Sequence, residues 1–191
     1  MNARGGATRG QIVDAADRLF YQQGYEHTSF ATIAGAVEIS RGNFYHHFKS
    51  KDLILDAVID ARVANTRRML EQWEAEHTAP GDRIRRFIEI LLTNQADIQN
   101  YGCPVGTLTS ELAKLDHAAL GEANSLFTLF RTWLRDQFAL LGHTAQADEL
   151  AMHVLAVSQG VATLANAFKD EEFIRREVRR MNDWLNTCTT T

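Results

Sequence analysis

The segment RGNFYHHFKSK, from Arg41 to Lys51, concentrates side chains that are well suited to binding a nucleic acid. A guanidinium can donate two hydrogen bonds to guanine, and a carboxamide can form a bidentate pair with adenine. We therefore predict that Arg41 and Asn43 read base edges and that Tyr45 adds a third contact. Gly42 has no side chain, so the backbone at this point can come close to the groove wall.

A second group of side chains is suited to holding phosphates. The predicted phosphate contacts are Ser29, Thr32, Tyr45, His46 and Lys51. Backbone N–H groups at helix starts can serve in the same way. A lysine in the first turn of a helix is mildly unfavourable to the helix dipole, and a phosphate opposite Lys51 would offset that cost.

Phe44 and Phe48 indicate how these polar side chains are held. Residues four positions apart lie on one face of a helix, so the two rings can bury one side of a short helix while its polar residues point outward. Ser40 is a good N-cap for this helix, and Ser29 is a good N-cap for a short helix before it. The apolar residues of that preceding helix are Phe30, Ile33, Ala34 and Val37.

A tight turn over residues 37–39 joins the two short helices into a helix-turn-helix arrangement. A first helix is expected to start near Thr8, because Thr8 and Gln11 have the spacing of a capping box. Gly24 is placed to end that helix in a left-handed conformation. In such a module the first turn of the last helix enters the major groove of DNA.

The charge distribution restricts nucleic-acid binding to the N-terminal part. The formal net charge is −4, but residues 1–51 carry six Lys/Arg against four Asp/Glu, whereas residues 52–191 carry fourteen against twenty. Only the first segment therefore suits a polyanion. Cys103 and Cys188 form no disulfide framework, which favours a reducing cytoplasm. No apolar run approaches the roughly 18 residues that span a bilayer, so we expect no membrane partner.

Helical periodicity continues through the rest of the chain. We predict an all-α protein of about nine helices, with an N-terminal three-helix helix-turn-helix module at residues 1–50. A larger helical ligand-binding and dimerisation domain is expected at residues 51–191. The fourth helix is expected to end near His77, before Pro80. One following helix is expected to carry both Ile84 and Ile98.

Over TSFATIAGAVEISRGNFYHHFKSKDLIL the sequence resembles the DNA-binding module of tetracycline-repressor-type (TetR/AcrR) regulators. The matching residues are Ile33-Ala34, Ser40, Phe44-Tyr45, Phe48, Lys51 and Leu53, together with Ala15, Leu19, Phe20 and Gly24-Tyr25. The resemblance implies a homodimeric bacterial transcription factor, usually a repressor, whose C-terminal helical domain binds a small molecule and releases DNA. One departure is Val37-Glu38, where the family often has Ala-Gly. A non-glycine residue in this turn is expected to carry about 1 kcal/mol of left-handed strain.

Two stripes along a predicted helix at residues 145–168 indicate self-association. The first, at heptad spacing, consists of Leu150, Val154, Val157, Val161, Leu164 and Phe168. The second is made mostly of small residues. One stripe is expected to pack on its own core and the other on a partner subunit, and a two-fold dimer requires a pseudo-palindromic operator. We predict a dimer interface at Ala151, Leu155, Ser158, Ala162, Ala165, Ile174, Val178 and Met181.

An effector pocket is predicted in the C-terminal domain. Its lining residues would be Phe87, Leu91, Cys103, Leu108, Thr109, Phe127, Phe130, Trp133, Leu155 and Gln159. Ordinary core packing is the alternative explanation for the apolar members.

Cys103 precedes Pro104, a residue favoured at the first helical position, so its thiol would lie at a helix N-terminus that stabilises thiolate. The alternative is a small buried hydrophobe. The segment GCPVGTLTSEL is similar to one in electrophile-responsive members of the family, so the effector is expected to be apolar or electrophilic.

Two alternatives to a ligand-responsive regulator follow from the same sequence. Glu74 and His77 have the spacing of a di-metal helix-bundle site, but such a site needs two of these pairs and two further carboxylates. Glu149 and His153 have no second histidine to complete a zinc site. We therefore expect no enzyme, no metal and no cofactor. A DNA-binding protein without an effector is the other alternative, and the size of the helical domain argues against it.

Overall fold

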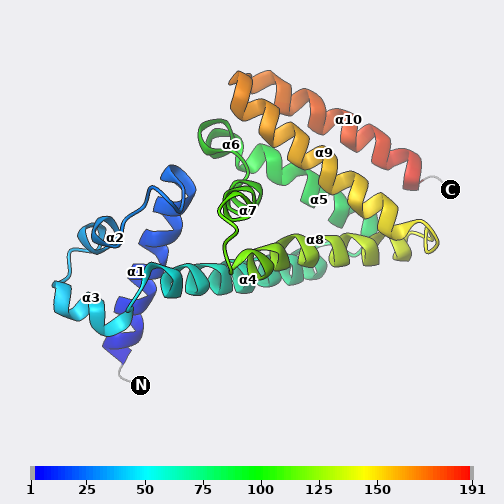
Figure 1. Ribbon diagram of the computed structural model, residues 1–191. Helices are drawn as coiled ribbons and strands as arrows, with labels where there is room; N and C mark the ends of the chain where they lie inside the picture. Colours follow the sequence, from blue (N-terminus) through cyan, green and yellow to red (C-terminus); the bar gives the residue numbers. More distant parts are fainter. Residues whose placement is uncertain (1–2, 190–191) are drawn as a thin grey trace. The chain divides into compact units, whose positions relative to one another are not determined.

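The structure is a computed structural model that describes residues 3–189, and within them the side chains of residues 6–40, 42–170 and 172–189. Residues 3–189 contain ten helices and no strand (Figure 1). The predicted all-α class, with about nine helices, is confirmed. The helices are α1 (Ala3–Gln23), α2 (Phe30–Ala36), α3 (Arg41–His47), α4 (Lys51–Glu76), α5 (Pro80–Thr93), α6 (Gln95–Tyr101), α7 (Pro104–Lys114), α8 (Leu120–Leu140), α9 (Ala147–Phe168) and α10 (Glu171–Thr189).

Two predicted helix boundaries were wrong. α1 begins at Ala3, so Thr8 lies inside the helix instead of capping it. The helix expected to carry both Ile84 and Ile98 is divided at Asn94, whose φ of −105° and ψ of 19° are not helical. The Asn94 side-chain amide donates to the Ile90 carbonyl over 3.1 Å, and such local side-chain bonds compete with the helical backbone pattern.

The first compact unit contains residues 3–65 and 107–125. Its core joins apolar residues of α1, α2, α3 and the first half of α4 with Leu108, Leu112, Ala119 and Ala123. Gly24 has a φ of 88°, which confirms the predicted left-handed end of α1. A Cβ at that position would lie 3.0 Å from a carboxylate oxygen of Glu111, so both the conformation and the space favour glycine.

The turn between α2 and α3 has the strain that the sequence predicts. Glu38 adopts a φ of 51° in the left-handed region, directly after Val37 ends α2. A residue with a Cβ is disfavoured there by about 1 kcal/mol relative to glycine. The turn nevertheless forms, because helices on both sides of it are anchored in the core.

The second compact unit contains residues 66–106 and 126–189. Figure 1 shows α5, α9 and α10 side by side, and they share one apolar core. Among the described helices, α9 is the one long and apolar enough to cross a membrane by length and composition. Eight of its residues are buried inside the protein, so α9 is a core helix.

The predicted division between residues 50 and 51 separates the helix-turn-helix from the rest of the chain and stays a prediction. α4, α7 and α8 each contribute residues to both compact units. Packing therefore groups the N-terminal helices with the segment 107–125, which is distant in sequence.

Candidate nucleic-acid interface and effector cavity

α2 and α3 are short helices that begin at side-chain caps. Ser29 has an extended backbone, and its hydroxyl accepts the Thr32 N–H over 3.0 Å. The Ser40 hydroxyl accepts the Asn43 N–H over 3.3 Å in the same way. Each cap satisfies a backbone donor that a seven-residue helix would otherwise expose, so both helices begin where the sequence predicts.

Aromatic contacts hold α3 on its scaffold. Phe44 is fully buried and Phe48 is 2% exposed, as expected for residues on one helix face. The Phe30 ring meets Phe44 edge-on at a centroid distance of 4.7 Å, and it also lies 5.0 Å from the Tyr45 ring. α2 and α3 are thus joined by ring packing as well as by their turn, which gives α3 a defined position.

The opposite side of α3 carries the residues predicted to read bases. Gly42 and Asn43 are exposed, and Tyr45 is 50% exposed beside the Phe30 ring. Arg41 begins the helix, and its side chain lies outside the described residues. The described side chains in the first turn of α3 are therefore directed to solvent by the burial of Phe44, and their base contacts stay a prediction.

The residues predicted to hold phosphates differ in how strongly they are engaged within the protein. The hydroxyls of Ser29 and Thr32 share a 2.7 Å hydrogen bond at an exposed site, and His46 is exposed. Lys51 donates to the Tyr25 carbonyl over 2.9 Å, and its ammonium lies 4.0 Å from the centre of the Tyr25 ring. Lys51 therefore also holds the start of α4 against the turn that follows α1.

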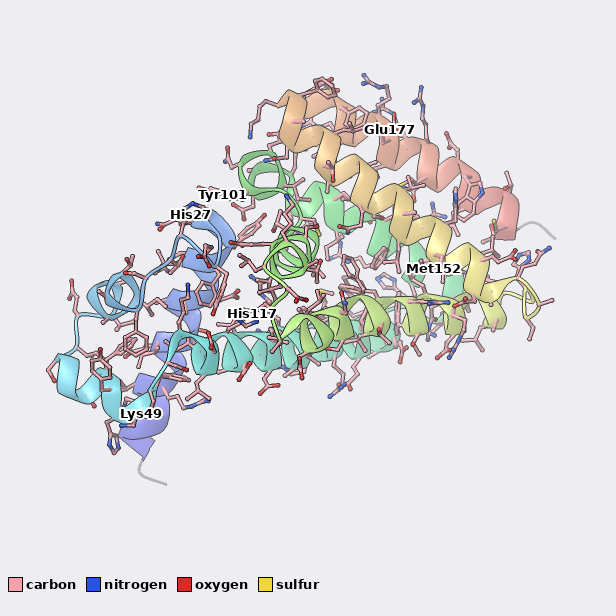
Figure 2. All side chains as sticks on the ribbon, viewed as in Figure 1. His27, Lys49, Tyr101, His117, Met152 and Glu177 are labelled. Carbon is pink, nitrogen blue, oxygen red and sulfur yellow. The ribbon has the colours of Figure 1, made fainter. Side chains whose placement is uncertain are left out.

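A polar network around Tyr25 supports the helix-turn-helix. The Tyr25 hydroxyl donates a hydrogen bond to Asp52 and lies 3.2 Å from His117 Nε2. Figure 2 labels His117. Burial raises the pKa of Tyr25 far above its ordinary value, and the Asp52 carboxylate raises it further. The hydroxyl therefore stays protonated and remains a donor at every physiological pH. His117 Nδ1 accepts the Ala119 N–H, which leaves Nε2 to face the tyrosine.

Glu111 is a supporting residue that the sequence did not reveal. Its two carboxylate oxygens accept the backbone N–H groups of Tyr25 and Glu26, both over 2.9 Å. The carboxylate thus satisfies backbone donors of the turn that follows Gly24, although Glu111 lies 86 residues after Tyr25 in the chain. No local pattern marks this pairing, because Glu111 lies on an ordinary amphipathic helix and its partners are backbone groups.

Comparison with known proteins agrees with this geometry. Residues 12–58 match the family described as "Bacterial regulatory proteins, tetR family". Residues 80–180, more than half of the chain, match the family described as "Transcriptional regulator LmrA/YxaF-like, C-terminal domain". The chain belongs to the TetR family of transcriptional regulators. It is accordingly a DNA-binding regulator of transcription, in a family that is not enzymatic.

Relatives and solved structures match between two thirds and all of this TetR-family chain. An uncharacterised HTH-type transcriptional regulator of Lactococcus lactis is 28% identical over 85% of this chain and 85% of its own length. The HTH-type transcriptional repressor DhaR of a Mycobacterium species is 24% identical over 66% of this chain and 62% of its own. A TetR-family regulator of Cytophaga hutchinsonii, 18% identical, has the same fold, with a TM-score of 0.83 over 100% of this chain and 99% of its own.

The second unit of this TetR-family chain contains a cavity of about 100 Å³. Seven of the ten predicted pocket residues line it: Phe87, Leu91, Cys103, Phe127, Phe130, Leu155 and Gln159. Leu108 and Thr109 are instead buried in the first unit, and Trp133 packs edge-on against Trp73. The sequence missed Ile90, Asn94, Ile98, Pro104, Val105, Ser158 and Ala162. Helical periodicity marks buried faces, and it does not separate a cavity wall from solid core.

Cys103 lies in this cavity wall at the start of α7. Its sulfur receives the Gln159 side-chain amide at 3.3 Å and the Gly106 N–H at 3.5 Å. A Cβ on Gly106 would lie 2.3 Å from the Gln159 amide oxygen, so a larger residue at this position would displace the Gln159 side chain. The sulfur therefore accepts two hydrogen bonds within its own chain, and the reactivity predicted for Cys103 stays a prediction.

The residues predicted to form the dimer interface are all buried within their own chain. Ala151, Ala165 and Ile174 are fully buried, and the others of the set are at most 6% exposed. The small-residue stripe of α9 therefore packs against its own core. The exposed side of α9 is a different, mostly apolar stripe, which contains Met152, Ala156, Gly160, Thr163, Leu164, Ala167 and Phe168. We call this stripe the outer face of α9; Figure 2 labels Met152 on it.

The carboxylates and histidines considered as metal ligands make other contacts. Glu74 accepts the Trp133 indole N–H over 2.7 Å, and His153 packs against the Trp184 ring at a centroid distance of 4.7 Å. The described residues contain no group of three His, Cys, Asp or Glu side chains arranged to hold a metal ion.

Proposed function

We propose that this TetR-family chain is a cytoplasmic homodimeric repressor that leaves a pseudo-palindromic operator when a small apolar or electrophilic effector binds its C-terminal domain. The observation that carries the proposal is the arrangement of α3. Phe44 and Phe48 fill one side with buried rings, and the first turn presents exposed polar groups on the other. This is the geometry that major-groove reading requires.

Base reading is assigned to the exposed first turn of α3, with Asn43 and Tyr45 as its described side chains and Arg41 and Gly42 beside them. The Ser29 and Thr32 hydroxyls at the start of α2, His46 and Lys51 would contact phosphates on either side of the groove. Phosphate contacts position a protein on DNA, whereas base contacts specify the sequence. We therefore assign base reading to the first turn of α3, at the centre of this surface, and phosphate binding to the residues on either side of it.

Dimerisation is assigned to the outer face of α9. Leu164 is 43% exposed and Phe168 is 75% exposed, and small residues such as Gly160 allow close helix approach. A two-fold pair would present two α3 helices to half-sites about 34 Å apart on one side of DNA. This stripe replaces the one predicted from the sequence, which is already used inside the chain.

Repression and release rest on two supports. One relative, 24% identical over 127 residues, is by name a repressor. The apolar cavity beside Cys103 is a site where a small molecule could shift the chain between two states with different DNA affinity. Release follows only if the effector binds the free state more tightly than the DNA-bound state.

Selection from random duplexes, followed by fluorescence anisotropy on the selected sequence, tests the proposal. The expected operator is an imperfect palindrome, bound by two subunits with an affinity that falls steeply as salt rises. A chemical library would then be screened for compounds that both raise the melting temperature of the protein and release the operator. Binding of one subunit to a site without symmetry would contradict the dimeric arrangement. Equal affinity for all duplexes would contradict sequence-specific regulation.

A further inference from the structure

The chemistry of the cavity walls limits what the cavity can hold. Its fourteen lining residues include no Asp, Glu, Lys, Arg or His. Phe87 and Phe130 meet edge-on in the wall at a centroid distance of 5.3 Å, and Leu155 adds apolar surface. Burying an ion without a charged partner costs far more than burying an apolar group. A ligand of this cavity is therefore uncharged and mainly apolar.

The polar lining residues differ in how many of their hydrogen bonds are already used. The Gln159 amide N–H donates to Cys103 Sγ, its oxygen lies beside Gly106, and the side chain is half-buried. Asn94 donates to the Ile90 carbonyl and is exposed to solvent. These two side chains thus have partners inside the chain or access to water.

Ser158 is the exception. It is 4% exposed and lines the cavity, yet its hydroxyl has no hydrogen-bond partner among the described residues. A serine inside a helix can donate to the carbonyl one turn earlier, and Ser158 does not. A buried hydroxyl without a partner is unfavourable, so its position beside a cavity points to a partner supplied by a ligand.

We propose that the cavity binds a small, uncharged, mostly apolar molecule with one hydrogen-bonding oxygen. The Ser158 hydroxyl forms a hydrogen bond with this oxygen. Alcohols, phenols and carbonyl compounds of about the size of one ring belong to this class. The cavity, at about 100 Å³, is smaller than an apolar cavity of about 150 Å³ that holds benzene, so one ring is the upper limit for its ligand. The inference rests on the proposed effector site and adds the chemical class of its ligand.

Phenol and benzene form a matched pair of probes, because they differ by one hydroxyl. Protein-observed NMR titrations of the full chain, without DNA, would give their dissociation constants. We expect the wild-type protein to bind phenol roughly five-fold more tightly than benzene, the preference that one net hydrogen bond provides. We expect benzoate and benzylammonium not to bind. Equal affinity for phenol and benzene, tighter binding of either ion, or no binding of phenol at millimolar concentration would overturn the proposal.

Ser158→Ala tests the assignment to this hydroxyl. The variant should lose the preference for phenol while its melting temperature in the absence of probe stays equal or rises, since an unpaired buried hydroxyl is removed. A hydroxyl with a purely structural role would give a lower melting temperature and an unchanged preference. Ser125→Ala, at an exposed serine of α8, is the matched control and should behave as wild type in both measurements.

Ala162→Val locates the probes in the same cavity. Ala162 lines it and is 1% exposed, so the added methyl groups take up cavity space. Both phenol and benzene should bind more weakly to this variant, and unchanged affinities would place them elsewhere and overturn the proposal. Because no DNA is present in these titrations, their failure leaves operator binding untouched. Conversely, failure of operator selection would not affect the predicted preference of the cavity for phenol over benzene.

Discussion

Asn43 and Lys51 are both polar residues in or near α3, but their side chains make different contacts in the free protein. Asn43 is exposed, and only its backbone N–H is engaged, at the Ser40 cap. The Lys51 ammonium is already bonded to the Tyr25 carbonyl and lies over the Tyr25 ring. Substituting Asn43 should change DNA recognition alone, whereas substituting Lys51 should also lower the stability of the protein.

We expect Asn43→Ala to lose about 1–3 kcal/mol of discrimination at one base position, with an unchanged melting temperature. Lys51→Ala should weaken binding to all duplexes, flatten the salt dependence and lower the melting temperature. Anisotropy with the selected operator and its single-base variants, over a range of salt, separates the two. Asn100→Ala, at an exposed asparagine of α6, is a control for loss of an amide. Loss of base discrimination in both variants would show that the division of roles is incorrect.

Cys103 is the second residue whose surroundings suggest a specific test. Its sulfur accepts hydrogen bonds over 3.3 Å and 3.5 Å and lines the cavity, and cysteine is the side chain that electrophiles modify. We expect N-ethylmaleimide to release the operator from the wild-type protein and not from Cys103→Ser. Cys188→Ser provides a matched control, since Cys188 is also half-buried and lies outside the cavity lining. If all three proteins released the operator equally, the effector would not act as an electrophile at Cys103.

At the scale of elements, the turn between α2 and α3 stores local strain. Glu38 holds a left-handed backbone that glycine adopts without cost. Glu38→Gly should therefore increase the free energy of unfolding by about 1 kcal/mol, measured by urea denaturation. Glu71→Gly, at an exposed helical position in α4, should have the opposite sign, with a loss of about 1 kcal/mol. A destabilised Glu38→Gly protein would mean that the turn depends on the glutamate side chain.

The start of α4 carries a row of carboxylates. Burial raises the pKa of Asp56, and the nearby carboxylates of Glu122, Asp52 and Asp60 raise it further. A raised carboxyl pKa means that the folded state holds its proton more tightly than the unfolded state. The contribution of Asp56 to stability is therefore largest at acidic pH, and it falls as pH rises from the ordinary aspartate pKa through the raised value.

Asp56→Asn removes this charge and should raise the melting temperature at pH 7 relative to wild type. The difference should shrink towards about pH 3, where the aspartate is protonated in the folded state. Calorimetry at both pH values measures it. Asp97→Asn in α6 is a control for loss of one negative charge. A gain in acid as large as that at neutral pH would exclude titration of Asp56 as the cause.

At the scale of the whole molecule, α9 has two apolar faces, one packed on the core of its own chain and one exposed. Ala162 and Ala165 face the core of their own chain, so a charge at either position should unfold the protein and not simply separate subunits. Ala156 and Ala167 are exposed on the outer face of α9. A charge there meets only solvent in the monomer, but it would be buried in the proposed dimer.

The double variant Ala156→Glu/Ala167→Glu should keep its helical circular dichroism and sediment as a monomer. Its operator affinity should fall because each half-site would be bound separately. Ala75→Glu, at an exposed alanine of α4, should remain dimeric and bind as wild type. A dimer that persists at sedimentation equilibrium in the double variant would place the interface on another surface.

The sequence by itself determined the elements of the DNA-binding module. Ser29 and Ser40 are caps, Phe44 and Phe48 share a buried face, and Glu38 sits in a left-handed turn, because each of these features depends on residues a few positions apart. The exposure of Gly42, Asn43 and Tyr45 follows from the same spacing. Half of the residues of the cavity wall, seven of fourteen, were also predicted from the sequence.

Only the tertiary structure decided which groups meet across long stretches of chain. Glu111 reaches the backbone at Tyr25 and Glu26, and the small stripe of α9 turns inward while the stripe with Leu164 and Phe168 stays outside. A helix with two apolar faces is compatible with either orientation, and the choice depends on how the neighbouring helices pack. The unpaired hydroxyl of Ser158 beside the cavity has the same origin, since a hydrogen bond that is missing can be seen only once all possible partners have positions.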